Sequence, residues 1–328
     1  MINKLILTLK GIAMGAANVV PGVSGGTIAL ITNIFEELIN TLKSFDKEAL
    51  RLLFKGNFID FFQKINLKFL IPVFAGIIIS IFSLAKIIEH LLETQPNNIW
   101  AYFFGLVLAS VYYVGKKINK WNIPNILFLT LGIAIALCLS LLNPSPIENT
   151  NYFFIFICGV IGISGMILPG LSGSYILMLM GNYQLLMVKS VNSFFEFIKL
   201  VLSGQLDVFS QNAEMQNHLI YLTIFVLGSV IGIVAFSHLI ALIFKKYKNI
   251  TLALLTGFIF GSLATIWPWK NEVFDLNTLD INNQPLFIGY ERYIPNNWNT
   301  PELIVVGCVF LGMISIIIIE LLANKSSK

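Results

Sequence analysis

The sequence predicts an all-α polytopic membrane protein made of two repeats with inverted topology. Hydrophobic residues make up 56% of the 328-residue chain and charged residues only 12%, which is about half the charged fraction of an ordinary soluble domain. Several continuous apolar runs approach the length of about 20 residues that a helix needs to cross a bilayer. Two further apolar regions are interrupted by the same pattern, Pro-Gly-x-Ser-Gly, at residues 21–25 and 169–173. Matching breaks in two halves are typical of a transporter.

Both halves of the chain carry the same ordered series of residues, which indicates an internal duplication. An offset of 148 aligns the two Pro-Gly-x-Ser-Gly patterns, and an offset of 152 continues the alignment through the later apolar runs. The matched pairs include Gly11 with Gly159, Pro21 with Pro169, Ser24 with Ser172, Gly56 with Gly204, Gly76 with Gly228, and Ser110 with Ser262.

We expect the first repeat to comprise residues 1–148 and the second residues 149–328. Each begins with an interrupted region that is predicted to form a re-entrant helical hairpin, over about 5–43 and about 152–191. Residues 44–62 place phenylalanine and leucine among lysine and arginine, which predicts an interfacial amphipathic helix, with a solvated loop helix as the alternative. The three transmembrane helices predicted in each repeat cover about 69–92, 99–115 and 124–142, and about 219–244, 250–267 and 301–323.

The distribution of lysine and arginine sets the predicted orientation. Residues 43–68 contain six basic residues against three acidic ones, and the N-terminal segment is also basic, so both ends of the first interrupted region should face the cytoplasm. That region therefore folds back as a hairpin, and both chain termini are expected in the cytoplasm. Three spans per repeat then invert the second half relative to the first. If the interrupted regions crossed completely, the basic turn at 116–120 would fall outside.

The tips of the two predicted hairpins have the composition of an anion site. Irregular backbone is tolerated at membrane depth only where protein or a water-filled cavity satisfies its polar groups. The second arm of each hairpin begins near Ser24 or Ser172, where free N–H groups and the positive end of the helix dipole would favour a phosphate or a carboxylate. The alternative is a packing kink of small residues, but alanine would pack as well as these hydroxyl residues. The predicted substrate-binding residues of the tips are Asn18, Gly22, Val23, Ser24, Gly25, Gly26, Thr27, Gly170, Leu171, Ser172, Gly173 and Ser174.

Ionisable residues within apolar runs supply further candidates, because such residues are rare in bilayers and commonly functional. Lys86 and His238 align at the offset of 152 and are candidate phosphate contacts, while Glu36 is a candidate proton-coupling carboxylate. The alternative for residues near the ends of runs is that they extend to the membrane interface. The three cysteines have no metal-site spacing, and no metal or cofactor is predicted. The net charge of +4 follows from topology and requires no nucleic-acid partner.

Two segments closely resemble the signatures of a known family. Residues 10–36 read KGIAMGAANVVPGVSGGTIALITNIFE, and residues 165–183 read GMILPGLSGSYILMLMGNY. The first resembles the hallmark of the polyprenyl-phosphate transporter family (PopT), long known only as a domain of unknown function, and the second matches it too. A small departure is Asn33-Ile-Phe, where the family pattern has Gly-Ile-Tyr. The resemblance implies a bacterial plasma-membrane protein that returns undecaprenyl phosphate from the outer to the inner leaflet. The oligomeric state stays open.

Two other functions compete with this interpretation. The membrane-embedded undecaprenyl-pyrophosphate phosphatases have a tip motif that resembles Pro-Gly-x-Ser-Arg-Ser, but here Gly25 and Gly173 occupy the arginine position. Phosphoanhydride hydrolysis needs cationic stabilisation of the developing charge, and the two arginines of the chain, Arg51 and Arg292, are both expected in loops. The chain is therefore predicted not to be an enzyme. A transporter of a small soluble anion would use the same tips with a closed aqueous cavity.

Overall fold

The structure is a computed structural model, and it describes residues 4–19, 24–142, 148–279 and 285–325. The described residues of the first half form eight helices: α1 (Lys4–Val19), α2 (Gly25–Ile31), α3 (Phe35–Lys43), α4 (Lys47–Phe54), α5 (Phe58–Lys64), α6 (Leu67–Thr94), α7 (Pro96–Gly115) and α8 (Ile123–Leu141). The second half begins with α9 (Tyr152–Ile167), α10 (Gly173–Leu179), the π-helix η1 (Gln184–Lys189), α11 (Ser190–Ser203) and α12 (Leu206–Gln211). It continues with α13 (Ala213–Lys246), α14 (Lys248–Ser262), the strands β1 (Lys270–Leu279) and β2 (Pro285–Arg292), and α15 (Thr300–Lys325).

Five helices among the described residues are long and apolar enough to span a membrane, namely α6, α7, α8, α13 and α15, so the chain is a mostly helical, multi-pass membrane protein. The sixth predicted span, about 250–267, is helical as α14 over only 15 residues, which at about 1.5 Å per residue is shorter than the hydrocarbon core. Large apolar side chains on the outer faces of the helices are exposed, as a lipid-facing surface requires; Phe82 of α6 is 81% exposed and Ile123 of α8 is 77% exposed.

Two predicted elements differ from the structure. The single interfacial helix expected over residues 44–62 is two helices, α4 and α5, because Gly56 adopts φ +71° and ends the first, while the Asn57 side chain accepts a hydrogen bond from Asp60 N at the start of the second. The acidic loop between α14 and α15 contains an antiparallel β-hairpin, so the chain is not entirely α-helical. Aromatic and β-branched residues on both sides of Asn282-Asn283 in the sequence are the signal that would have predicted these strands.

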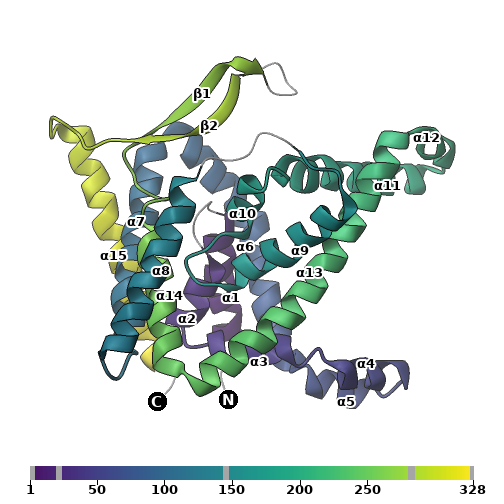
Figure 1. Cartoon of the computed structure of the whole chain (residues 1–328), viewed down its shortest axis with the longest axis horizontal. Helices are drawn as coiled ribbons and strands as arrows, with labels where there is room; N and C mark the ends of the chain where they lie inside the picture. The colour runs from purple at the N-terminus through teal and green to yellow at the C-terminus, as the bar shows by residue number, and fades with distance from the viewer. Residues whose placement is uncertain (1–3, 20–23, 143–147, 280–284, 326–328) are drawn as a thin grey trace.

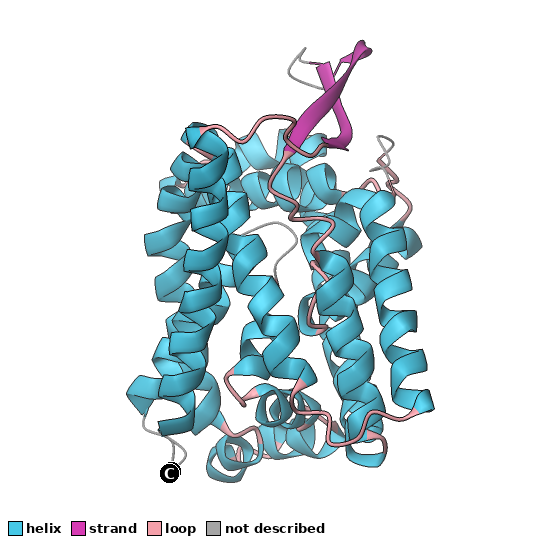
Figure 2. Ribbon diagram, turned by 90° about the vertical axis from the view of Figure 1, so that its left-hand side faces the viewer, coloured by secondary structure: helices cyan, strands magenta, loops and turns pink. Residues whose placement is uncertain are grey.

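The two ends of the molecule carry different elements (Figure 1). The start of α1, the end of α15 and the short helices α4 and α5 lie at one end, which we call the terminal end. The β-hairpin and the helices α11 and α12 lie at the opposite end, called the hairpin end. Figure 2 shows the long helices standing side by side with the β-hairpin projecting beyond them.

Close helix pairs are made by glycines at matching positions of the two halves. α1 packs along α6, and a Cβ added to Gly76 would lie 2.1 Å from the Thr8 carbonyl oxygen. α9 packs along α13 in the same way, and a Cβ on Gly228 would lie 2.3 Å from the Phe156 carbonyl oxygen. Gly228 and Phe156 are the residues that the sequence offsets align with Gly76 and Thr8. The backbones therefore approach too closely for any side chain to separate them.

The remaining long helices form two pairs that each join one half of the chain to the other. α7 packs along α15, and α14 packs along α8. A Cβ on Gly105 of α7 would lie 1.9 Å from the Val309 carbonyl oxygen, and one on the aligned Gly257 of α14 would lie 2.2 Å from the Leu129 carbonyl oxygen. The two halves are thus interlocked, with the second span of each packed against the third span of the other.

Candidate functional site at the junction of two helix breaks

The first break places a serine at the start of a short buried helix. Ser24 has extended backbone and precedes α2, and its Oγ accepts a hydrogen bond from Gly26 N. Gly25 N donates to Asn18 Oδ1 of α1 at 2.7 Å. Ser24 is 2% exposed and Thr27 is 1% exposed. The N–H groups that the sequence suggested would be free at this tip are therefore bonded within the first break itself. Gly22 and Val23, which were predicted to bind substrate, lie outside the described residues.

The two breaks meet, although they are more than 140 residues apart in the sequence. Ser24 Oγ lies 3.2 Å from the carbonyl oxygen of Leu168 and donates to it, while Gly170 N donates to Thr27 Oγ1 at 3.1 Å. A Cβ added to Gly26 would lie 2.6 Å from the Ile167 carbonyl oxygen. Each break therefore satisfies polar groups of the other, as backbone at membrane depth requires. We call this contact the tip junction.

The second break is more open than the first. Ser172 precedes α10 but makes no side-chain cap hydrogen bond; its Oγ instead pairs with Ser174 Oγ at 2.8 Å. Leu171, Ser172 and Ser174 are partly exposed, whereas Gly170 and Gly173 are buried. A cavity of about 10 Å³ lies beside this break, which is room for about one water molecule. Its lining includes Ser140, Gly170, Leu171, Ser172, Tyr175 and Thr265.

Two lysines hold the other end of α2. Lys10 of α1 donates to the Thr32 carbonyl oxygen at 2.7 Å, and Lys117 donates to the Leu30 carbonyl oxygen at 2.5 Å. Cations are favourable at a helix C-terminus, where carbonyl groups lack partners. Lys117 also donates to Asn33 Oδ1, so the turn after α7 is tied to the segment that follows α2.

Asn33 explains the departure from the family motif. Its φ is +61°, and the aligned residue of the second half is Gly181 with φ +77°, so the position requires the left-handed conformation that glycine and asparagine adopt most readily. We expect Asn33→Gly to be tolerated and Asn33→Val to lower the free energy of unfolding by about 1–3 kcal/mol. Thermal unfolding in detergent tests this, with Asn40→Val in the helical backbone of α3 as the control. Equal losses for both valine variants would contradict the strain argument.

Lys117, which reaches α2 from the turn after α7, should have an unusually low pKa. Burial lowers the pKa of Lys117 from 10.5 to about 8. Between pH 8 and 10.5 the unfolded chain retains a proton that the folded chain has lost, so the free energy of unfolding rises with pH over this window. We expect thermal stability in detergent to rise from pH 8 to 10 more steeply in the wild type than in Lys117→Met. A slope of stability against pH that equals the wild-type slope in Lys116→Met, and is reduced only in Lys117→Met, would assign the titration to Lys117.

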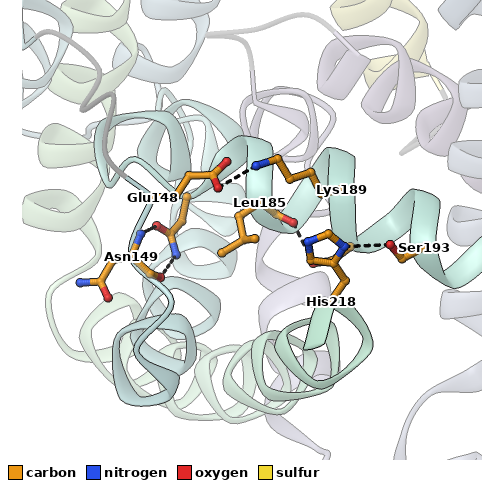
Figure 3. Close-up of polar contacts among 8 residues, drawn as sticks. Glu148, Asn149, Leu185, Lys189, Ser193 and His218 are labelled. Atoms are coloured by element: carbon orange, nitrogen blue, oxygen red, sulfur yellow. Dashed lines mark hydrogen bonds and ion pairs between the residues drawn. The ribbon is translucent and has the colours of Figure 1, made fainter. Parts of the chain in front are cut away.

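The outer part of the second break is anchored by a polar cluster, shown in Figure 3. Asn182, which is fully buried, exchanges two hydrogen bonds of 2.8 Å with the backbone of Asn149. Lys189 of η1 forms an ion pair of 2.8 Å with Glu148. Ser193 Oγ of α11 lies 2.9 Å from His218 Nδ1 of α13. The bonds of Asn182 and Lys189 hold the residues before α9 against the segment that follows α10, and the bond between Ser193 and His218 holds α11 against α13.

Three predicted site residues are not brought to the tip junction by any described contact. Lys86 lies in α6, and its side chain is outside the described part of the structure. His238 Nδ1 lies 2.8 Å from the Val234 carbonyl oxygen of its own helix. Glu36 is exposed at the start of α3, where it forms an ion pair of 3.3 Å with Lys248. Figure 1 shows α3 near the terminal end of the molecule, and the ion pair of Glu36 with Lys248 involves neither break.

The sequence analysis missed the cations at the base of the β-hairpin. Arg292 was expected in a loop, yet it ends β2 and is the register partner of Lys270 in β1; Arg51 lies in α4. Arg292 Nε donates to the Ala264 carbonyl oxygen at 2.7 Å, and its Nη2 donates to the Ser140 carbonyl oxygen at 3.0 Å. Ser140 lines the cavity beside the second break. The pairing of two strands, which the sequence analysis did not predict, is what brings Arg292 there.

The fold and the tip junction define a class: a multi-pass membrane protein in which two broken helices meet inside an apolar bundle, as in membrane transporters. Residues 14–281 match the model of the VCA0040-like family, which is described as undecaprenyl phosphate translocase-like. The chain belongs to this family.

Two curated relatives agree with the family match. The chain is 40% identical over 271 residues, 83% of its own length and 80% of the relative, to a polyprenyl-phosphate transporter of Vibrio cholerae. It is 29% identical over 276 residues, 81% of its length and 87% of the relative, to a polyprenyl-phosphate transporter of Staphylococcus aureus. No solved structure matches the chain. The relatives are named as transporters and not as enzymes. This confirms the prediction that the chain is not an enzyme and argues against the phosphatase alternative.

Proposed function

We propose that this protein moves undecaprenyl phosphate from the outer to the inner leaflet of the bacterial plasma membrane, using the tip junction as its phosphate site. The contact between the two breaks carries the proposal. In the closed junction Ser24 Oγ donates to the Leu168 carbonyl oxygen, and Thr27 Oγ1 accepts from Gly170 N. Separation of the tips would release two hydroxyls and an N–H group together, and a phosphate could replace the lost bonds with charge-assisted ones.

The proposal includes alternating access between two inverted repeats, each with a re-entrant hairpin. It is supported by the matched glycine contacts of α1 with α6 and of α9 with α13, and by the positions of α4–α5 and α11–α12 at opposite ends of the molecule (Figure 1). In this arrangement the α1–α2 hairpin would enter from the terminal end and the α9–α10 hairpin from the hairpin end. Rocking of one repeat against the other would then open the junction to one side at a time. The terminal end would face the cytoplasm.

The prenyl chain requires an apolar path beside the phosphate route. An apolar groove of about 560 Å³ lies between α7, α8 and α14. Its lining includes Val111, Tyr112, Leu129, Ile133 and Phe260, with Lys116 and Trp121 also present. A groove on the side of the bundle would let the chain stay against lipid while the headgroup crosses, and aromatic and basic residues of this kind are typical of the membrane interface.

Translocation of labelled undecaprenyl phosphate in proteoliposomes, with and without an imposed proton gradient, tests the function. Movement that requires the protein supports the lipid transporter, and acceleration by the gradient supports proton coupling. Glu36→Gln would then separate its proposed coupling role from surface ion pairing, since only the former predicts loss of the response to the gradient. Absence of lipid movement by folded protein under both conditions would refute the proposal and favour a carrier of a small soluble anion.

A further inference from the structure

The base of the β-hairpin contacts two residues that line the cavity beside the second break, since Lys270 bonds to Thr265 and Arg292 bonds to Ser140. Lys270 and Arg292 face each other in the register of β1 and β2. Lys270 is buried, with 8% exposure; its Nζ donates to the Thr265 carbonyl oxygen at 2.8 Å and lies 3.4 Å from the centre of the Trp100 ring. The hairpin therefore places two cations, the buried Lys270 and the half-buried Arg292, against the ends of the membrane helices.

Arg292 joins two helices of different halves of the chain. Its two hydrogen bonds reach the Ala264 carbonyl oxygen, two residues beyond the end of α14, and the Ser140 carbonyl oxygen, near the end of α8. Carbonyl groups at helix ends attract cations, so a purely structural clamp is the alternative to be tested. Both of these acceptors are neutral carbonyl groups, so within the described part of the chain the hydrogen bonds of Arg292 supply no anion to the guanidinium.

Hydroxyl groups line the space between Arg292 and the second break. Ser140 Oγ lies 2.7 Å from Thr265 Oγ1, and Tyr175 OH donates to the Leu139 carbonyl oxygen at 3.2 Å. Ser172 Oγ pairs with Ser174 Oγ. Ser140, Thr265, Tyr175 and Ser172 all line the cavity of about 10 Å³, which has room for about one water molecule and not for a phosphate. The space is thus rich in hydroxyls and closed.

We infer that Arg292 and the hydroxyls of Ser140, Thr265, Tyr175 and Ser172 form an entry site for a phosphate monoester headgroup at the hairpin end, closed here by the carbonyl bonds of Arg292. This inference rests on the proposed function and adds a cationic group to it. A planar guanidinium can exchange two carbonyl acceptors for two phosphate oxygens without changing its geometry, and the new bonds are charge-assisted. The headgroup would then pass from Arg292 to Ser172 and on to the tip junction.

The chain offers a selective chemical test, because its two arginines are Arg51 and Arg292. In an Arg51→Lys variant, modification by phenylglyoxal reports on Arg292. We expect undecaprenyl phosphate to slow this modification at least fivefold, and undecaprenol, which lacks the phosphate, to leave it unchanged. Inorganic phosphate distinguishes a site for free phosphate from a site for the lipid headgroup. If inorganic phosphate also protects Arg292, the site recognises phosphate alone; if only undecaprenyl phosphate protects it, the site requires the lipid headgroup. Equal protection by undecaprenol, or none by any ligand, would overturn the inference.

Transport kinetics separate a binding role from a clamp. Arg292→Gln should raise the lipid concentration needed for half-maximal transport at least tenfold, and Arg292→Lys should restore only part of the affinity, because one ammonium cannot bridge both acceptors. Arg51→Lys should transport normally. If Arg292→Gln transports the lipid at the wild-type rate and with unchanged affinity, the inference is refuted and the proposed function stands. If the wild-type protein itself does not transport the lipid, the proposed function is refuted. If Arg292→Gln does not fold, Arg292→Lys and the protection experiment decide.

Discussion

Replacing Ser24 and Ser172 together by alanine is expected to reduce translocation of undecaprenyl phosphate by roughly a hundredfold to ten-thousandfold, because each hydroxyl removed from a charged ligand costs about 1.5–3 kcal/mol and the double variant loses two. Expression should be retained. The measurement is lipid translocation in proteoliposomes containing matched amounts of folded protein. A double variant with alanine at Ser83 and Ser203, which are exposed on other helices, controls for loss of hydroxyl groups in general.

The two single variants should differ in stability. Ser24 Oγ caps α2 and donates to the Leu168 carbonyl oxygen, so Ser24→Ala should also lower the free energy of unfolding by about 1 kcal/mol. Ser172 makes no side-chain cap bond, so Ser172→Ala should lower transport with little change in thermal stability. Normal transport by the folded double variant would refute the role of the hydroxyls in phosphate binding.

Gly170→Ala is expected to abolish transport and to lower stability by about 2–6 kcal/mol, the sum of backbone strain and overpacking. Gly170 has φ +83°, and an added Cβ would lie 2.5 Å from Ile259 N and from the Phe258 carbonyl carbon of α14. Neither partner is a flexible side chain, so the second break would have to move away from α14. Its N–H bond to Thr27 in the tip junction would be lost with that movement.

Gly204 is a matched control for this substitution. It has φ +71°, but an added Cβ would meet nothing within 4 Å, so Gly204→Ala carries the strain of the left-handed conformation without the clash. Thermal unfolding and transport of both variants in the same detergent and lipid separate the two contributions. Equal losses in Gly170→Ala and Gly204→Ala would show that the close approach of the second break to α14 has no special importance.

Much of the secondary structure could be predicted, because hydrophobic length and helix-breaking residues are local properties of the sequence. The predicted spans at about 69–92 and 301–323 correspond to α6 and α15 within about two residues. The split of residues 44–62 into α4 and α5 depends on the left-handed Gly56, which a pattern of apolar residues does not reveal. The span predicted at about 250–267 extends about five residues beyond the end of α14 at Ser262. The β-hairpin was missed because the acidic composition of residues 270–292 resembles that of a loop.

The candidate site was predicted in part. The Pro-Gly-x-Ser-Gly repeat pointed to Ser24, Thr27 and Ser172, and Ser24 and Thr27 lie in the tip junction. The repeat could not indicate that Asn18 and Ser24 bond the N–H groups of the first break, because that depends on the angle between α1 and α2. It also gave no role to Arg292, whose position is set by strand pairing with Lys270.

Local sequence properties are sufficient to identify a membrane protein with two broken helices, because hydropathy and proline–glycine breaks act through the local backbone and the surrounding lipid. The sequence also carried the family motif and the position of Asn33, where a left-handed residue is needed. Which groups meet depends on the packing of the whole bundle: Ser24 contacts Leu168, Thr27 contacts Gly170, and Arg292 contacts Ser140. These contacts join residues more than 140 positions apart, and their geometry follows from helix packing through glycines, which is a property of the whole bundle.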